Sequence, residues 1–107
     1  MVSTANFAKV AERKDLAEGQ MKLVELGEEQ VCLANIKDNY YAIGNVCTHE
    51  QGPLNEGTLD GYEVECPWHQ ARFDVRSGEV LSPPAETPVP SYEVKVQGND
   101  ILIRRKN

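Results

Sequence analysis

The two histidines of this chain lie in one pattern, which they share with two of its three cysteines. Cys47 and His49 form a C-x-H unit, and Cys66 and His69 form a C-x2-H unit, with residues 50–65 between them. Thiolates and imidazoles are metal ligands, and two separate units can bind one metal centre only if the fold brings them together. The pattern therefore demands a fold in which two loops meet.

The segment between the two units predicts how they meet. Asp60 and Gly61 are a strong tight-turn signal, because both central residues of a type I′ turn need positive φ angles. A reversal at this point makes the flanking segments run antiparallel and brings Cys66 level with about Asn55. One hairpin then places the two units side by side at its open end, where each supplies one thiol and one imidazole.

The ligand set itself narrows the choice of cofactor. Two cysteines and two histidines are the ligands of a Rieske [2Fe–2S] centre, in which imidazoles replace thiolates on one of the two irons. Such a centre exchanges one electron at a time, which predicts an electron carrier. The same four side chains could bind zinc tetrahedrally in a structural module, although C-x-H is shorter than the usual zinc knuckle.

Length and charge limit the remaining possibilities. A chain of 107 residues is one domain with a single modest core. The net charge of −6, from 11 basic and 17 acidic residues, argues against nucleic-acid binding and suits docking on a basic partner surface. The N-terminal residues show no secretory signal, and no segment approaches the roughly 20 apolar residues of a membrane span. We therefore expect a cytoplasmic protein without a membrane role.

The alternation of apolar and polar residues predicts a nearly all-β chain. Residues 13–19 are polar and end in glycine, so they should form a turn or a single helical turn. Strands at this spacing favour an antiparallel sandwich or small-barrel base, with an inserted lobe at about residues 45–85 that carries every metal ligand. We expect this lobe to be disordered without metal. The predicted strands are residues 7–10, 21–26, 30–36, 40–43, 62–65, 92–96 and 101–104.

Five runs of sequence together resemble the Rieske ferredoxins, above all the small carriers of bacterial ring-hydroxylating dioxygenase systems. The resemblance extends over nearly the whole chain, because the length and the flanking strands also match a stand-alone ferredoxin. The runs are residues 47–54 (CTHEQGPL), 57–61 (GTLDG), 66–74 (CPWHQARFD), 77–78 (SG) and 83–85 (PPA).

The resemblance implies a Rieske fold and one [2Fe–2S] cluster in a single domain, residues 1–107. It implies that Cys47 and Cys66 bind the inner iron, that His49 and His69 bind the outer iron, and that Pro83 begins a proline loop covering the cluster. It also implies a monomer that carries electrons from a flavin-dependent NAD(P)H reductase to a terminal oxygenase of aromatic hydrocarbon catabolism. Such a carrier is not itself an enzyme.

Two departures from the wider superfamily are informative. The Rieske proteins of quinol-oxidising complexes carry a disulfide between their cluster loops, and the corresponding positions here are Gly52 and Trp68. Those proteins also place two hydroxyl groups against the cluster sulfurs, where this chain has Ala71 and Phe73. Because donors to sulfur stabilise the extra electron, their absence predicts a potential near the low end of the Rieske range, about −150 mV.

The residues around the ligands include candidates for docking. Glu50, Gln51, Pro53 and Leu54 flank His49 and are candidates for a docking rim, with solvated loop residues as the alternative. We expect Trp68 to pack beneath the cluster rather than lie exposed at the tip of the protein. The acidic residues at positions 56, 60, 63 and 65 could steer a basic partner, although charge on a hairpin is more often a solvated face.

Three further expectations follow. Cys32, outside the motif, should be a small buried hydrophobic residue. A non-haem iron oxygenase needs two more histidines, so the chain has no visible equipment for catalysis. The potential should fall as pH rises through the pKa values of the ligand imidazoles. The alternative to a shuttling electron carrier is a different class of function: a Rieske-like small subunit of a nitrite reductase or of another multi-subunit oxidoreductase.

Overall fold

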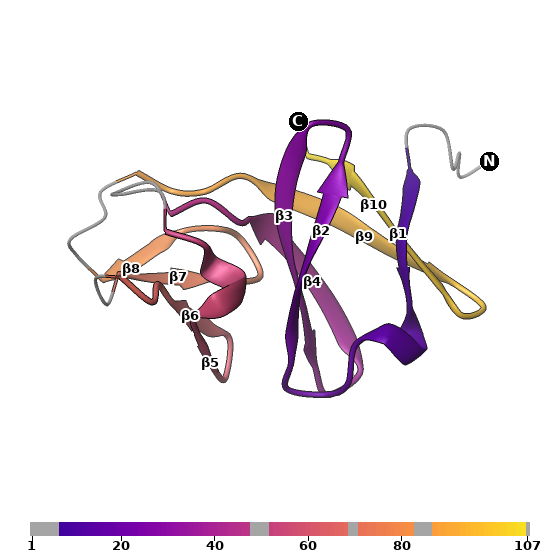
Figure 1. Cartoon of the computed structure of the whole chain (residues 1–107), viewed down its shortest axis with the longest axis horizontal. Coiled ribbons are helices and arrows are strands. Elements are labelled where there is room, and N and C mark those ends of the chain that lie inside the picture. Colours follow the sequence, from indigo (N-terminus) through magenta and orange to yellow (C-terminus); the bar gives the residue numbers. More distant parts are fainter. Residues whose placement is uncertain (1–6, 48–51, 69–70, 83–86, 107) are drawn as a thin grey trace.

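The computed structural model describes residues 7–47, 52–68, 71–82 and 87–106 and arranges them in two antiparallel sheets (Figure 1). The prediction of a nearly all-β chain is confirmed. The strands are β1 (Ala8–Glu12), β2 (Met21–Leu26), β3 (Glu29–Ile36), β4 (Asn39–Gly44), β5 (Thr58–Asp60), β6 (Glu63–Glu65), β7 (Arg72–Asp74), β8 (Val80–Ser82), β9 (Ser91–Gln97) and β10 (Asp100–Arg105), with 3-10 turns η1 (Arg13–Asp15) and η2 (Leu54–Glu56).

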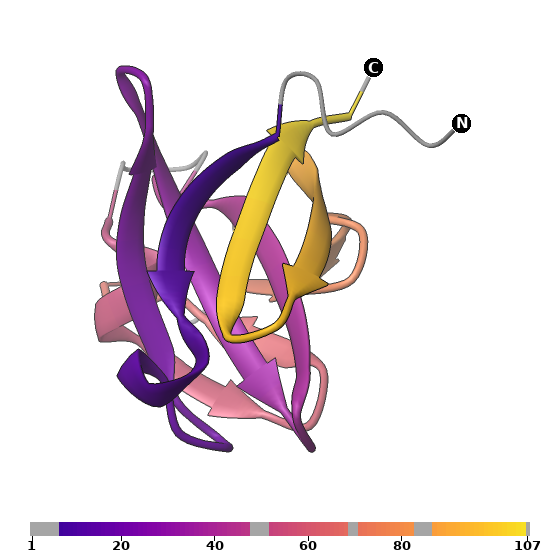
Figure 2. The same ribbon diagram turned by 90° about the vertical axis from the view of Figure 1, so that its right-hand side faces the viewer.

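The larger sheet has six strands in the order β1-β10-β9-β4-β3-β2 and forms the base of the molecule. It curls until its two end strands, β1 and β2, come into contact, so that it is nearly closed (Figure 2). Closure protects the exposed edges of the sheet from pairing with other chains. The strand spacing favours a sandwich or a small barrel, and the base is the second of these.

The smaller sheet is a meander of four strands, β5-β6-β7-β8, inserted between β4 and β9. Strands β5 and β6 are the expected hairpin, with Thr58 opposite Glu65 and Asp60 opposite Glu63. The turn therefore centres on Gly61 and Tyr62, and only Gly61 of the two has a positive φ, 61°. This is the residue pattern of a type II′ turn, because glycine takes its first central position, and not of the type I′ turn we predict.

The shifted turn corrects the predicted register. With Thr58 opposite Glu65, the next position brings Cys66 level with Gly57 rather than with Asn55. A Cβ atom on Gly57 would lie 1.9 Å from the carbonyl oxygen of Glu65, so only glycine fits where these strands approach. Strands β7 and β8 were not predicted, because three-residue strands carry too little periodic signal.

Strand β3 is buried on both faces, and this explains how base and lobe join. Val31 and Leu33 face the core inside the base, whereas Cys32 and Ile36 belong to a second core beneath the lobe. Strand β4 divides in the same way, with Ala42 in the first core and Ile43 in the second. The second core also contains residues of the candidate site: Cys47, Leu54, Val64, Cys66, Ala71, Phe73, Val75 and Val89.

Aromatic and charged side chains add a contact at the junction of base and lobe. The rings of Tyr41 on β4 and Tyr62 in the lobe turn lie edge to face, with centroids 5.9 Å apart. The guanidinium carbon of Arg76 lies 4.2 Å from the centre of the Tyr62 ring. Arg76 also donates to both carboxylate oxygens of Asp74, at 3.0 and 2.9 Å. These contacts restrain the lobe relative to the base.

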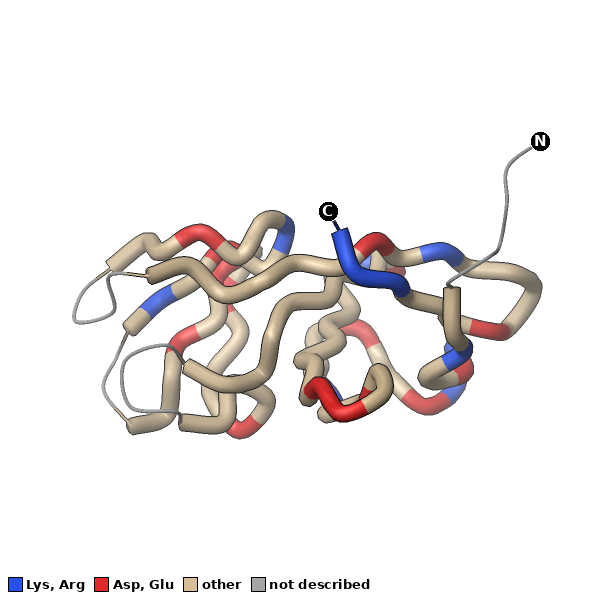
Figure 3. The backbone as a smooth tube through the Cα atoms, turned by 90° about the horizontal axis from the view of Figure 1, so that it is seen from above, with Lys and Arg blue, Asp and Glu red and all other residues tan. Residues whose placement is uncertain are grey.

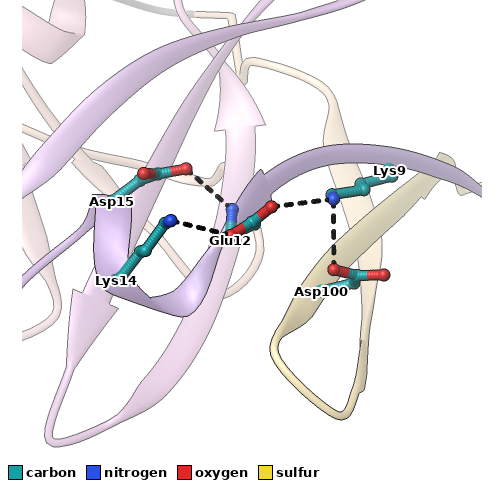
Figure 4. Close-up of polar contacts among 5 residues, drawn as sticks. All are labelled: Lys9, Glu12, Lys14, Asp15 and Asp100. Atoms are coloured by element: carbon teal, nitrogen blue, oxygen red, sulfur yellow. Dashed lines mark hydrogen bonds and ion pairs between the residues drawn. The ribbon is translucent and has the colours of Figure 1, made fainter.

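The far end of the base carries a separate polar cluster (Figure 4). Lys9 forms ion pairs with Glu12 at 3.0 Å and Asp100 at 3.2 Å, and the carboxylate of Asp15 accepts the N–H of Glu12 at the start of η1. Hydrogen bonds to Glu12 and Asp100 raise the pKa of Lys9, and those from Lys9 lower the pKa of Glu12. Each of these side chains is at least partly exposed to solvent, so the ion pairs add little to stability. No helix in the described ranges is long and apolar enough to cross a bilayer.

Candidate metal centre

The first cysteine lies in a short antiparallel stem that continues from β4. The N–H of Leu54 donates to the carbonyl oxygen of Asn45 at 2.7 Å, and the N–H of Cys47 donates to the carbonyl oxygen of Gly52 at 2.9 Å. The predicted ligand His49 falls in residues 48–51, outside the described residues. The stem holds Cys47 at its last rung before that segment.

The second cysteine lies in an equivalent stem that continues from β6 and β7. Glu65 is paired with Arg72, and the N–H of Cys66 then donates to the carbonyl oxygen of Ala71 at 2.8 Å. The predicted ligand His69 also lies outside the described residues. In both stems the cysteine N–H donates to the carbonyl of the fifth residue along the chain, so the two units share one backbone design despite different Cys-to-His spacings.

The two stems pack directly against each other at Gly52. A Cβ atom on Gly52 would lie 2.8 Å from the Sγ atom of Cys66 and 3.1 Å from the Cδ2 atom of Trp68. Since real Cβ atoms do not approach neighbours that closely, this position in the first loop accepts only glycine without a shift. The prediction that the fold brings the two cysteine loops side by side is confirmed.

The described part of the site fits an iron–sulfur cluster in its donor chemistry. Cys47 and Cys66 are 0% and 1% exposed, and the three cysteines, all of them described, form no disulfide. Cysteines that are buried and form no disulfide can serve as metal ligands, since a bound metal supplies the positive charge that a buried thiolate requires. Two cysteines alone do not complete a metal site, and no group of three or more metal-binding side chains occurs within the described ranges.

Two described side chains beside the cysteines are apolar. Ala71 and Phe73, at the positions where the resemblance places the hydroxyl groups of the quinol-oxidising Rieske proteins, are both fully buried in the core that contains the two cysteines. Neither side chain can donate a hydrogen bond to sulfur. The low potential that we expect from the lack of these two donors stays a prediction.

Two expectations about the neighbourhood of the ligands are wrong. Leu54, a candidate for the docking rim, is fully buried, because η2 turns its side chain into the core beneath the lobe. Trp68 is 59% exposed, although its ring packs against Gly52, so it is not enclosed beneath the site. Pro53 pairs with Val46 in the first stem and is partly buried. Glu50 and Gln51 lie outside the described residues.

Cys32 is confirmed as a buried residue of the core and lies on β3 beneath the lobe. Its Sγ atom lies 3.6 Å from the Sδ atom of Met21. Burial raises the pKa of the Cys32 thiol to about 12, so this cysteine stays protonated at neutral pH. A neutral thiol is a poor metal ligand, since the thiolate is the binding form.

The charge on the lobe sheet is not balanced locally. Arg72 on β7 lies 2.7 Å from a carboxylate oxygen of Glu65, 3.4 Å from Glu63 and 3.9 Å from Asp60. One guanidinium thus faces three carboxylates, which leaves this hairpin negative. Acidic residues occur on the tube of both sheets, whereas a basic run marks the C-terminal end of β10 (Figure 3).

Asn45 and Asn55 are structural residues of the site that the sequence motifs do not reveal. The Asn45 side chain accepts the N–H of Asn55 at 2.8 Å and donates to the side-chain oxygen of Asn55 at 2.9 Å. Asn45 is 1% exposed. The available signal was a polar residue two positions before a metal-binding cysteine, which alone does not distinguish a buried side chain from a solvated one.

Comparison with known proteins agrees with this geometry. The family described as "Rieske [2Fe-2S] domain" matches residues 6–93. The ferredoxin component of the naphthalene 1,2-dioxygenase/salicylate 5-hydroxylase systems of Ralstonia sp. is 33% identical over 101 residues, which span 94% of this chain and 97% of that protein.

Solved structures give the same result. The ferredoxin of carbazole 1,9a-dioxygenase from Nocardioides aromaticivorans IC177 superimposes with a TM-score of 0.91 at 34% identity, over 95% of this chain and all (100%) of that one. A chain from a complex of reduced oxygenase and oxidized ferredoxin in carbazole 1,9a-dioxygenase superimposes with a TM-score of 0.88 at 31% identity, over 95% of this chain and 97% of that one.

Proposed function

Because this chain belongs to the Rieske [2Fe–2S] domain family, we propose that it is a ferredoxin that carries single electrons from a flavin-dependent NAD(P)H reductase to a terminal oxygenase. The observation that carries the proposal is its similarity, over 94% of its length, to a dioxygenase ferredoxin component that consists of little else. We extend the proposal to one Rieske domain over residues 1–107, with the cluster-binding lobe at about residues 45–85.

Four side chains would hold one [2Fe–2S] cluster: Cys47 and Cys66 on the inner iron, and His49 and His69 on the outer iron. When bound, such a cluster takes up and releases one electron at a time. The protein itself contributes by holding the ligand side chains in place. The two hydrogen-bonded stems would present both thiolates to the cluster, and the buried core around them would keep water from the cysteine side. A rigid cage keeps the reorganisation that accompanies electron transfer small.

Exposed apolar side chains beside the stems suggest where a partner would dock near the cluster. Val46, next to Cys47, and Trp68, two residues after Cys66, are both exposed. The carboxylates around Arg72 add negative charge on the same lobe and suit a partner with a basic surface. We propose that the reductase and the oxygenase dock in turn at this end of the molecule, and that the carrier works as a cytoplasmic monomer.

The role of a carrier agrees with the chemistry of the chain. Both histidines are assigned to the cluster, so none remains for a general base or for a mononuclear iron site. This chain covers 97% and 100% of two ferredoxin components, whereas it covers only 30% of the terminal oxygenase of carbazole 1,9a-dioxygenase. The organic reaction would therefore occur on the partner.

Electron paramagnetic resonance of the dithionite-reduced protein, with a redox titration of the same sample, tests the proposal. A rhombic Rieske signal at a potential near about −150 mV supports an oxygenase-type carrier. A colourless protein that contains zinc would contradict it in favour of a structural module. Purification in a stable complex with a catalytic subunit would instead favour a small subunit of a nitrite reductase or a similar enzyme.

A further inference from the structure

Asn45 occupies the point at which the first cysteine stem leaves the base. Its N–H donates to the carbonyl oxygen of Gln30 on β3 at 3.0 Å, and its carbonyl oxygen accepts the N–H of Leu54 at 2.7 Å. Its side chain forms the two hydrogen bonds with Asn55 described above, at 2.8 and 2.9 Å. The polar groups of Asn45 thus bind the base on one side and the returning strand of the loop on the other.

We propose that Asn45 is a positioning residue for the cluster, which sets the geometry of the Cys47 loop by closing that loop at its base. The inference rests on the proposed function, because it concerns the same site. The Asn45–Asn55 pair, the hydrogen bond from Leu54 to Asn45 and the hydrogen bond from Cys47 to Gly52 are successive rungs of one stem. If the lowest rung opens, the rungs above it lose their fixed register.

Because Asn45 is buried, its hydrogen bonds with Asn55 should have a large effect on the position of the Cys47 loop. Asn45 is 1% exposed, so water cannot replace the hydrogen bonds that its side chain makes. Replacing Asn45 by alanine leaves the N–H of Asn55 without its acceptor and the Asn55 side-chain oxygen without its donor. We expect the returning strand to shift toward solvent so that water binds these groups, and Gly52, which packs against the Sγ of Cys66, lies on that strand.

Asn35 provides a matched control in the same chain. It is also 1% exposed and also forms two side-chain hydrogen bonds, to the carbonyl oxygen of Leu16 and from the N–H of Asp38, both at 2.9 Å. These bonds close turns of the base and involve no residue of either cysteine stem. Asn35→Ala therefore removes an equivalent buried amide without touching the site.

The experiment compares Asn45→Ala with Asn35→Ala in the cluster-loaded protein. Three quantities are measured for each: the thermal unfolding midpoint, the g values and potential of the reduced cluster, and the rate of cluster loss to an iron chelator. Both variants should unfold at lower temperature. Only Asn45→Ala should change the g values and potential, and it should lose its cluster about 10-fold to 100-fold faster, the usual effect of removing a residue that orients metal ligands.

Each outcome has a definite meaning. Wild-type g values, potential and cluster retention in Asn45→Ala would overturn the inference, as would equal changes in Asn35→Ala. If Asn45→Ala does not fold, Asn55→Ala replaces it, because that variant keeps the backbone rungs and removes only the partner of the Asn45 side-chain N–H. It should show the same changes at smaller size, and its failure to do so contradicts the inference. Absence of a Rieske signal in the wild-type protein would instead contradict the proposed function.

Discussion

The Cα of Gly52 approaches Cys66 so closely that a Cβ atom would lie 2.8 Å from the Cys66 Sγ. The contact joins the first cysteine loop to the sulfur atom of Cys66 in the second. A side chain at position 52 must therefore displace either the thiolate or the loop. The requirement for glycine at position 52 is therefore steric and not conformational, since Gly52 is not among the glycines with positive φ.

Gly52→Ala should greatly reduce the amount of cluster that the purified protein retains, because the added methyl group displaces Cys66. The measurement is iron and sulfide content per chain, with the visible spectrum. Gly98→Ala is the control: it introduces strain at a φ of +60° in the β9–β10 turn but meets nothing within 4 Å. That control should lose about 1 kcal/mol of stability and keep its cluster. Equal cluster content in both variants would contradict the steric argument.

The proposed ligand set includes Cys47 and Cys66 but not Cys32, so substitutions of these cysteines should differ in their effect on the cluster. Cys66→Ser and His49→Cys should each abolish the Rieske EPR signal, although His49→Cys can retain a different cluster. Cys32→Ala should keep the wild-type signal and lose about 1 kcal/mol of stability from the small cavity that it leaves. An unchanged spectrum and potential in His49→Cys would show that the assignment of this ligand is wrong.

A hydroxyl group placed beside the cysteines should raise the potential. Ala71→Ser introduces a donor at a buried position next to Cys66. If its hydrogen bond to sulfur strengthens by about 1 kcal/mol on reduction, the potential rises by about 40 mV for one electron. Ala11→Ser, at another buried alanine in the core of the base, is the control and should leave the potential unchanged. Redox titration of both variants measures the change in potential, and a fall in potential for Ala71→Ser contradicts the prediction.

The Asp74–Arg76 pair predicts a pH dependence of stability. Hydrogen bonds from Arg76 lower the pKa of Asp74 below its ordinary value. The carboxylate therefore stabilises the folded state fully above the ordinary pKa of about 3.9, and this contribution is lost as pH falls through the lower folded value.

Asp74→Asn should accordingly cost about 1 kcal/mol or less at pH 6, since Arg76 is half exposed, and the cost should shrink toward pH 3. Urea unfolding of both proteins across this range measures the difference. Glu25→Gln, which also replaces one carboxylate by an amide on the exposed face of β2, is the control for the change of one charge. A difference that grows on acidification would mean that the carboxylate does not stabilise the fold through Arg76.

Much of the fold and site was predictable because it depends on local signals. Alternation of apolar residues marked the long strands of the base, such as β2 and β9, and the Asp60-Gly61 signal located the lobe hairpin within one residue. The C-x-H and C-x2-H spacings identified the two loops that meet. The burial of Cys32 likewise followed from its place in an apolar strand.

The sequence by itself determined the longer strands of the base and the meeting of the two cysteine units, because backbone periodicity and turn signals act over short distances. Its motifs also carried the resemblance to the family. Only the tertiary structure decided which side chains lie inside. It buried Leu54 and Asn45, left Trp68 exposed, and moved Cys66 level with Gly57. Those outcomes depend on how the lobe packs on β3 and how one stem contacts the other, and such long-range packing is not encoded in any single segment.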